Sequence, residues 1–177
     1  QIQGKISNSI KNDNIHEYNF AFKFISHIPN QSNIFIGNSL MIRAFDSHSD
    51  KFGKDILFFS NRGASGIDGN ISTALGISKA SPGRSNFLII GDQAFMHDLG
   101  SLQLLKELEN NLTIIIINNM GGAIFDYLNL SNSNVNSYEK FIRRSHKMNF
   151  KSIVHGYDLK YTQLKTLNDL SKISSGN

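Results

Sequence analysis

Short apolar runs alternate along the chain with longer segments in which apolar residues recur at a helical spacing. The apolar runs cover residues 33–36, 55–59, 86–90 and 112–117. Runs of this kind, rich in β-branched residues, are typical of parallel strands buried on both faces, above all at 86–90 and 112–117. The spacing predicts helices at 15–28, 38–47, 68–80, 97–108, 138–147 and 162–173. The alternation predicts one α/β domain with a doubly wound, mostly parallel sheet and helices on both faces.

A group of polar residues and glycines follows each predicted strand. These groups are Gly37–Asn38–Ser39, residues 60–66, Gly91–Asp92 and Asn118–Asn119. Turn formation explains any single group, because Asn, Ser and Gly are common turn residues. The carboxyl ends of parallel strands meet at one edge of a sheet, where α/β proteins bind ligands. The four groups together therefore predict one binding site.

The chemistry of two of these groups indicates a metal. Asp92 supplies a carboxylate, and Asn119 supplies an amide oxygen after the next strand. Carboxylate, amide and backbone carbonyl oxygens are ligands that Mg²⁺ accepts. Gly121 and Gly122 follow at once, and glycines let a backbone approach a bulky anion closely. The pattern predicts a divalent cation that joins the protein to a diphosphate.

Two arginines indicate acidic ligands. Arg62 follows a predicted strand in a glycine-rich loop, a setting suited to bidentate binding of a carboxylate. Arg43 stands four residues after Ser39, so both residues share a helix face. Structural ion pairs are the alternative for both arginines, with Asp46 or Asp50 as partners of Arg43.

Composition excludes several other classes of function. The net charge of +4 is ordinary surface charge, and the basic residues of 138–147 lack the interleaved aromatic platform of a nucleic-acid site. No apolar run reaches the roughly 18 residues of a membrane span. The chain has no cysteine, which excludes disulfides and thiolate metal sites and fits a reducing compartment such as the cytoplasm. We therefore expect neither a nucleic-acid partner nor a membrane.

These motifs resemble a known family. The pattern from Asp92 to Asn119 is similar to the signature with which thiamine-diphosphate enzymes bind Mg²⁺ and the diphosphate. The segment 61–69, which reads NRGASGIDG, together with residues 37–40 and 121–125, resembles the menaquinone-pathway MenD family, the 2-succinyl-5-enolpyruvyl-6-hydroxy-3-cyclohexene-1-carboxylate synthases. The resemblance covers about residues 15–161.

The resemblance implies thiamine diphosphate and Mg²⁺ or Mn²⁺ as cofactors, and a role for each matching residue. The metal ligands would be Asp92, Asn119 and the carbonyl of Gly121. The cofactor-binding residues would be Asn38, Ile67, Gly91, Asp92, Gln93, Asn119, Gly121 and Gly122, with Ile67 as the apolar prop beneath the bent cofactor. The catalytic and substrate-contacting residues would be Ser39, Arg43 and Arg62, with Ile124 and Phe125 as the pocket wall. Gln93, Gly100, Asn129 and Arg144–Ser145 depart from the residues usual in the family.

The implied reaction removes carbon dioxide from 2-oxoglutarate and adds the succinyl unit to isochorismate, in menaquinone or phylloquinone biosynthesis. The implied enzyme is a homodimer or homotetramer of the cytoplasm or plastid stroma. Nothing in the chain resembles the family's pyrimidine-binding and middle domains, or the last strand expected after Ser171. We therefore expect residues 1–177 to be the diphosphate-binding domain of such a synthase and to be inactive when isolated. Another thiamine-dependent carboligase and a non-catalytic binding or assembly domain of the same fold are the alternatives.

Overall fold

The computed structural model describes residues 16–50, 52–63, 65–108, 110–127 and 137–174. Its strands are β1 (Ser32–Ile36), β2 (Ile56–Phe59), β3 (Ser85–Gly91) and β4 (Leu112–Ile117). Its helices are α2 (Glu17–His27), α3 (Leu40–His48), α4 (Asn70–Ala80), α5 (Asp92–His97), α6 (Leu102–Glu107), α8 (Phe150–Gly156) and α9 (Ser171–Ser174). Shorter turns are η1 (Leu99–Ser101), η2 (Ala123–Tyr127), the π-helical η4 (Tyr138–Arg143) and η5 (Leu167–Leu170).

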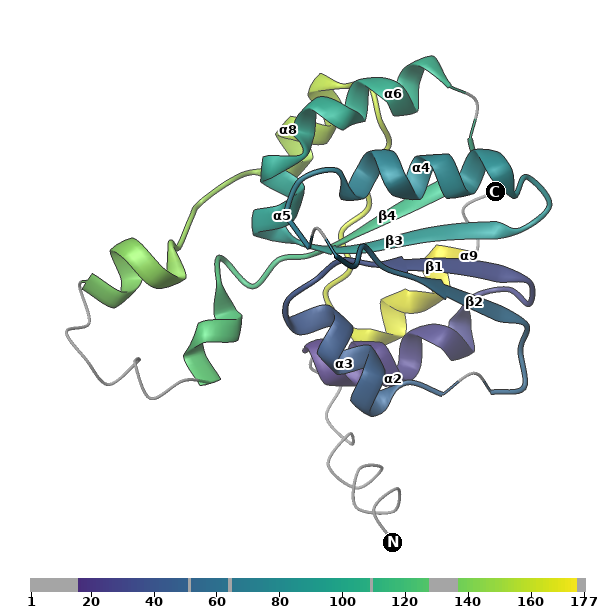
Figure 1. The fold of residues 1–177 in the computed structure, drawn as a ribbon, viewed down its shortest axis with the longest axis horizontal. Helices are drawn as coiled ribbons and strands as arrows, with labels where there is room; N and C mark the ends of the chain where they lie inside the picture. Colours follow the sequence, from purple (N-terminus) through teal and green to yellow (C-terminus); the bar gives the residue numbers. More distant parts are fainter. Residues whose placement is uncertain (1–15, 51, 64, 109, 128–136, 175–177) are drawn as a thin grey trace, which may run out of the picture.

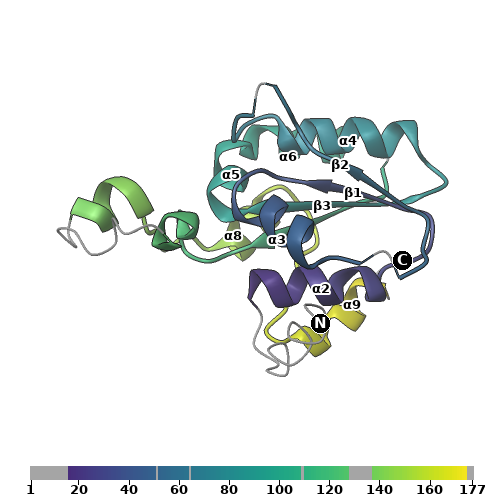
Figure 2. The same ribbon diagram turned by 60° about the horizontal axis from the view of Figure 1, so that its bottom comes forward.

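The four strands form one parallel sheet in the order β2-β1-β3-β4. Helices α2, α3 and α9 lie on one face, and α4, α5, α6 and α8 lie on the other (Figure 1 and Figure 2). The predicted α/β class and its doubly wound parallel sheet are confirmed. From β1 the chain continues to β2 at one edge of the sheet, and from β3 it continues to β4 at the opposite edge, so the direction of winding switches between β1 and β3. Ligands of such sheets bind at this switch of direction, at the carboxyl ends of the strands.

Alternating strand residues build two apolar layers that hold the sheet rigid. Phe24 of α2 is fully buried on the first face, with its ring 6.2 Å from that of Phe45 and 5.5 Å from that of Phe87. On the second face Leu88 and Phe95 are buried beneath α4 and α8. Burial of such side chains typically contributes about 1.5–3 kcal/mol each. The two layers fix where the ends of β1, β3 and β4 lie.

The outer strands are less buried than the sequence predicted. In β4 only Ile115 is buried, and Ile114, Ile116 and Ile117 are partly buried against the two core layers, so the expected full burial on both faces is not found in this strand. In β2, Leu57 and Phe58 are 46% and 38% exposed. Within the described residues neither strand has a neighbour on its outer side. A groove of about 840 Å³ follows β4, with residues 159–165 along its other wall.

The predicted helices are correct in the first half of the chain and need correction in the second. The segment expected as one helix at 97–108 contains only the last residue of α5, followed by a break, η1 and α6. Asp98 stands at the break, where its carboxylate accepts the Ile71 N–H of α4 (2.6 Å) and the Ser101 hydroxyl (2.7 Å). The helix expected at 138–147 ends at Arg143, because Arg144 has a φ of +52°.

The other two corrections concern the end of the chain. The helix expected at 162–173 begins only at Leu167, as η5, whose start is fixed by a capping box of Thr166 and Asp169. The sequence analysis did not predict α8, whose first turn is capped by the Asn149 side chain. Among the described residues no helix is both long enough and apolar enough to cross a bilayer.

Candidate functional site

A pocket of about 300 Å³ lies beyond the carboxyl ends of β1 and β3 and brings most of the predicted site residues together. The predicted residues that line it are Asn38, Ser39, Ile67, Gly91, Asp92, Gln93, Asn119, Gly121, Gly122, Ile124 and Phe125. Arg43 and Arg62 are absent from its lining. The pocket also has a wall from η4, contributed by Ile142 and Arg143. The expectation that the strand ends share one site agrees with this arrangement.

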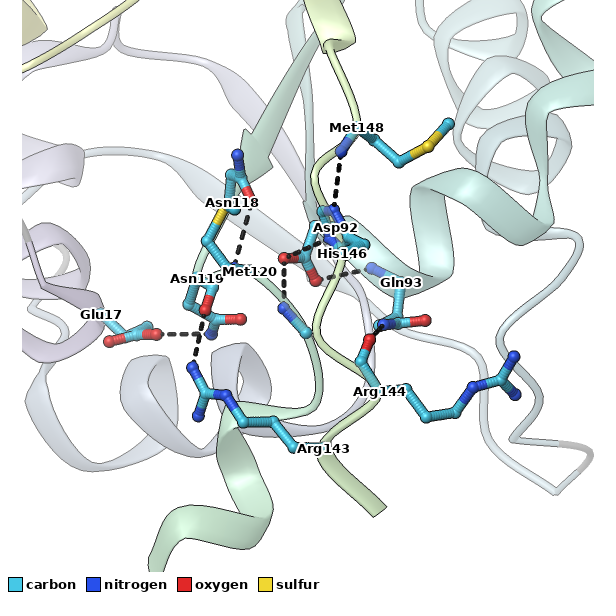
Figure 3. A network of polar contacts seen from close by, with 11 residues as sticks. Glu17, Asp92, Gln93, Asn118, Asn119, Met120, Arg143, Arg144, His146 and Met148 are labelled. Atoms are coloured by element: carbon cyan, nitrogen blue, oxygen red, sulfur yellow. Dashed lines mark hydrogen bonds and ion pairs between the residues drawn. The ribbon is translucent and has the colours of Figure 1, made fainter. Parts of the chain in front are cut away.

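Asp92 stands at the centre of this site, as the first residue of α5 directly after β3 (Figure 3). It is 1% exposed. Its Oδ1 accepts the Gln93 N–H (2.7 Å), and its Oδ2 accepts the Gly121 N–H (2.9 Å) and bonds the His146 Nε2 (3.1 Å). A carboxylate has about four lone-pair positions, so these three donors leave one on Oδ1 for a further ligand.

Asn119 supplies an oxygen that no group among the described residues uses. Its Nδ2 donates to the Glu17 Oε1 at 2.8 Å, which fixes the orientation of the amide. Its Oδ1 is buried and has no hydrogen-bond partner in the part of the chain that the structure describes. A buried polar atom left unpaired costs about 1–3 kcal/mol. Such an atom in a pocket indicates a ligand, and a cation satisfies an amide oxygen well.

The turn after β4 places the backbone N–H of Gly121 in a hydrogen bond with Asp92. Met120 has a φ of +66°, and its N–H donates to the Asn118 Oδ1 at 3.2 Å. Gly121 has a φ of +139°, a conformation that residues with a Cβ rarely adopt. A Cβ at Gly121 would lie 2.7 Å from the carbonyl oxygen of Arg143. The glycine is therefore required both by its dihedral angle and by its neighbour.

These residues fit a metal that carries a diphosphate. The donors available are the Asp92 carboxylate, the Asn119 Oδ1, which lacks a partner among the described residues, and the second lone pair of the Gly121 carbonyl, whose oxygen also accepts the Ala123 N–H at 2.9 Å. All are hard oxygens of the kind that Mg²⁺ and Mn²⁺ prefer. The described residues contain no cluster of three His, Cys, Asp or Glu side chains that could hold a metal alone. A cation at this site would depend on ligand oxygens to complete its shell, which is usual for Mg²⁺ bound with phosphates.

Three residues at the site were missed by the sequence analysis: Glu17, Arg143 and His146. Arg143 forms an ion pair with Asp126, and its Nη2 donates to the Asn119 carbonyl at 3.0 Å. Their contacts with Asn119, Asp126 and Asp92 join residues that lie between 17 and 102 positions apart in the chain. No local spacing reveals such contacts, so the sequence held no direct signal for them.

The two predicted arginines stand outside the pocket. Arg43 is on α3, and its Nη1 donates to the backbone carbonyl of Ser39 at 2.7 Å. Ser39 precedes the helix with a non-helical backbone, so the two residues are joined by this bond rather than by a common helix face. Ser39 lines the pocket and is exposed, with a φ of +75°. Arg62 is exposed in the loop after β2. Arg43 therefore lies beside the pocket, where it bonds a residue of the pocket lining, and Arg62 faces solvent.

Curated synthases of one name are similar to this chain in sequence. It is 41% identical over 154 residues to the 2-succinyl-5-enolpyruvyl-6-hydroxy-3-cyclohexene-1-carboxylate synthase of Lysinibacillus sphaericus, covering 86% of this chain and 27% of that protein. It is 41% identical over 141 residues to the synthase of the same name from Shewanella baltica, covering 80% of this chain and 24% of that protein. The chain therefore spans about a quarter of the length of these curated relatives.

The fold has a solved counterpart. The thiamine diphosphate-dependent 4-hydroxybenzoylformate decarboxylase of Rhodococcus jostii superposes with a TM-score of 0.73 over 91% of this chain and 30% of that one, at 19% identity. At that identity the likeness concerns the fold alone. Residues 44–174 match the family described as thiamine pyrophosphate enzyme, C-terminal TPP binding domain. This match, over most of the chain, shows that the chain belongs to the thiamine pyrophosphate enzyme family through its C-terminal TPP-binding domain.

Proposed function

We propose that this chain is the thiamine diphosphate- and Mg²⁺-binding domain of a synthase that decarboxylates 2-oxoglutarate and adds the succinyl unit to isochorismate. The observation that carries the metal assignment is the buried Asn119 Oδ1, which lacks a partner among the described residues and lines the same pocket as Asp92. Relatives of about 40% identity named as this synthase support the choice of reaction.

Each residue of the pocket would have its own role in binding the cation or the cofactor. Asp92, Asn119 and the Gly121 carbonyl would hold the cation, which in turn would neutralise a diphosphate. Gln93 and Gly122 line the same pocket and would contact that diphosphate. The bound thiamine supplies the chemistry that stabilises negative charge at the reacting carbon. Ile67 is 44% exposed and lines the pocket, which suits an apolar prop for the cofactor.

Apolar and basic residues around the pocket would serve the substrates. Ile124 and Phe125 form a wall that would limit the access of water to the reacting atoms. Ser39 and Arg43 are joined at the rim by a hydrogen bond, and Arg62 lies in an exposed loop. Guanidinium groups suit the carboxylates of two acidic substrates. In the described residues these arginines lie outside the pocket, so we propose that their part is to contact substrate at its entrance.

An assay of the full-length protein separates this function from its alternatives. We expect loss of 2-oxoglutarate and isochorismate in equal amounts, with release of carbon dioxide, only when thiamine diphosphate and Mg²⁺ are present. Pyruvate in place of 2-oxoglutarate serves as the control for another carboligase. Faster use of pyruvate would favour that alternative, and cofactor binding without turnover of either substrate would favour a non-catalytic domain.

We expect Arg62→Ala in the full-length protein to impair use of substrate far more than binding of cofactor. A hydrogen bond to a charged group typically contributes about 1.5–3 kcal/mol, which corresponds to roughly a 10- to 150-fold loss in kcat/KM. Arg62→Lys, which keeps the charge and loses the bidentate geometry, should show an intermediate loss. Wild-type steady-state constants for both substrates in Arg62→Ala would show that the arginine is structural.

We expect the isolated 177-residue chain to be catalytically silent and to bind thiamine diphosphate weakly, even with Mg²⁺. The pocket is open to water, which screens electrostatic contacts. Ile67, Met120 and Phe125 are 44%, 42% and 39% exposed, so the isolated chain should also self-associate. Substrate loss, calorimetric titration and sedimentation would measure the three effects. Turnover on the order of 1 per second or faster would contradict this expectation.

A further inference from the structure

Residues 143–148 pass beside the proposed metal site and form hydrogen bonds with Gly122, Gln93 and Asp92. The Arg143 carbonyl accepts the Gly122 N–H at 2.7 Å, and the Arg144 carbonyl accepts from the Gln93 side chain at 3.0 Å. His146 completes the series with its bond to Asp92 Oδ2 (Figure 3). This segment therefore contacts both halves of the motif, after β3 and after β4.

The contacts of His146 determine how its ring is protonated. Its Nδ1 accepts the Met148 backbone N–H at 3.3 Å. A backbone N–H only donates, so the proton of the neutral ring lies on Nε2. Nε2 therefore donates to Asp92 Oδ2 at 3.1 Å. The side chain is 11% exposed, and its ring meets Phe150 edge to face with centroids 5.7 Å apart.

We propose that His146 is a positioning residue for the cation, acting through its single hydrogen bond to Asp92. With Gly121 N–H, it occupies Oδ2 and leaves the free lone-pair position on Oδ1, so the carboxylate presents one oxygen to the metal. The proposal rests on the proposed function, because it assumes that Asp92 binds the cation. Groups that orient a metal ligand in this way typically change metal affinity 10- to 100-fold.

A second reading of the same contacts is that the ring only packs against Phe150. Three substitutions separate the two readings. His146→Phe keeps an aromatic ring and removes the donor. His146→Gln places an amide Nε2 at a reach similar to that of the imidazole Nε2, and His146→Asn places its amide too close to the main chain to reach Asp92. His155→Asn, at an exposed position on α8, is the matched control.

The test is Mn²⁺ affinity of the full-length protein with thiamine diphosphate present, measured from the paramagnetic resonance signal of free Mn²⁺. We expect His146→Phe and His146→Asn to raise the Kd about 10- to 100-fold, and His146→Gln to stay within about threefold of the wild type. His155→Asn should match the wild type. Metal-free thermal unfolding would show which variants fold.

The possible outcomes distinguish the positioning role of His146 from the proposed function on which it rests. Wild-type affinity in His146→Phe would show that the ring acts by packing alone and would overturn the proposal. If a folded His146→Gln protein bound Mn²⁺ as weakly as His146→Asn does, that result would also overturn the proposal. This comparison remains decisive even if His146→Phe fails to fold. Failure of the wild type itself to bind Mn²⁺ would overturn both this role and the proposed function.

Discussion

Replacing Asp92 by alanine in the full-length protein should abolish Mg²⁺-dependent binding of thiamine diphosphate. Asp92 is the one carboxylate among the three proposed donors, and its loss leaves cation and diphosphate poorly coupled. We expect the Kd of the cofactor to rise at least about 100-fold, which corresponds to about 2.8 kcal/mol. Alanine also leaves three donors without their acceptor, so some loss of stability should accompany the change.

Asp92→Asn keeps the shape of the side chain and separates loss of charge from loss of folding. Its one oxygen can still accept from Gly121 and His146, while the Gln93 N–H loses its acceptor, so this variant should lose less stability than Asp92→Ala and still bind the cofactor poorly. Asp158→Asn is the control, because that carboxylate lies on the surface beside Lys106, whose hydrogen bond lowers the pKa of Asp158. Calorimetric titration with thiamine diphosphate and Mg²⁺ measures all three variants. Unchanged cofactor affinity in a folded Asp92→Asn protein would refute the metal assignment.

Gly121→Ala should have the second largest effect. The new Cβ would meet the Arg143 carbonyl at 2.7 Å, and the φ of +139° is strained for any residue except glycine. A strained backbone of this kind costs about 1–3 kcal/mol. Because Gly121 N–H bonds Asp92, the turn would move away from the carboxylate and cofactor affinity would fall with stability.

Gly76→Ala is the control for this substitution. Gly76 lies in α4, with no atom within 4 Å of the position of its Cβ outside its own helix and neighbours. Alanine there should raise stability by roughly 0.5–1 kcal/mol, because it favours a helix more than glycine does. Denaturant unfolding compares the two variants. Equal stability and equal cofactor affinity in Gly121→Ala and the wild type would contradict the structural account of the turn.

The strands could be predicted from the sequence because each is a nearly continuous apolar run, and the observed bounds of β4 agree with the prediction. The helix at 97–108 could not be predicted correctly, because its break at Asp98 depends on a carboxylate that bonds Ile71 in another helix. The exposure of β4 likewise depends on its place in the sheet. Local patterns specify which segments form, and tertiary contacts decide where some of them end.

The candidate site divides in the same way. Asp92 and Asn119 were predictable because each stands two positions after an apolar run, where the carboxyl edge of a parallel sheet must lie. Glu17 and His146 were not predictable, because they come from other segments and reach these residues only in the folded chain. The sequence therefore revealed the proposed donors, and the structure was needed to find the groups that orient them.

Anomalous X-ray diffraction from crystals of the full-length protein grown with Mn²⁺ and thiamine diphosphate tests the central claim most directly. The account predicts one Mn²⁺ peak at about 2.0–2.6 Å from an Asp92 oxygen, Asn119 Oδ1 and the Gly121 carbonyl, shared with the diphosphate oxygens. A peak elsewhere, or a diphosphate bound in this protein without a cation between Asp92 and Asn119, would contradict it.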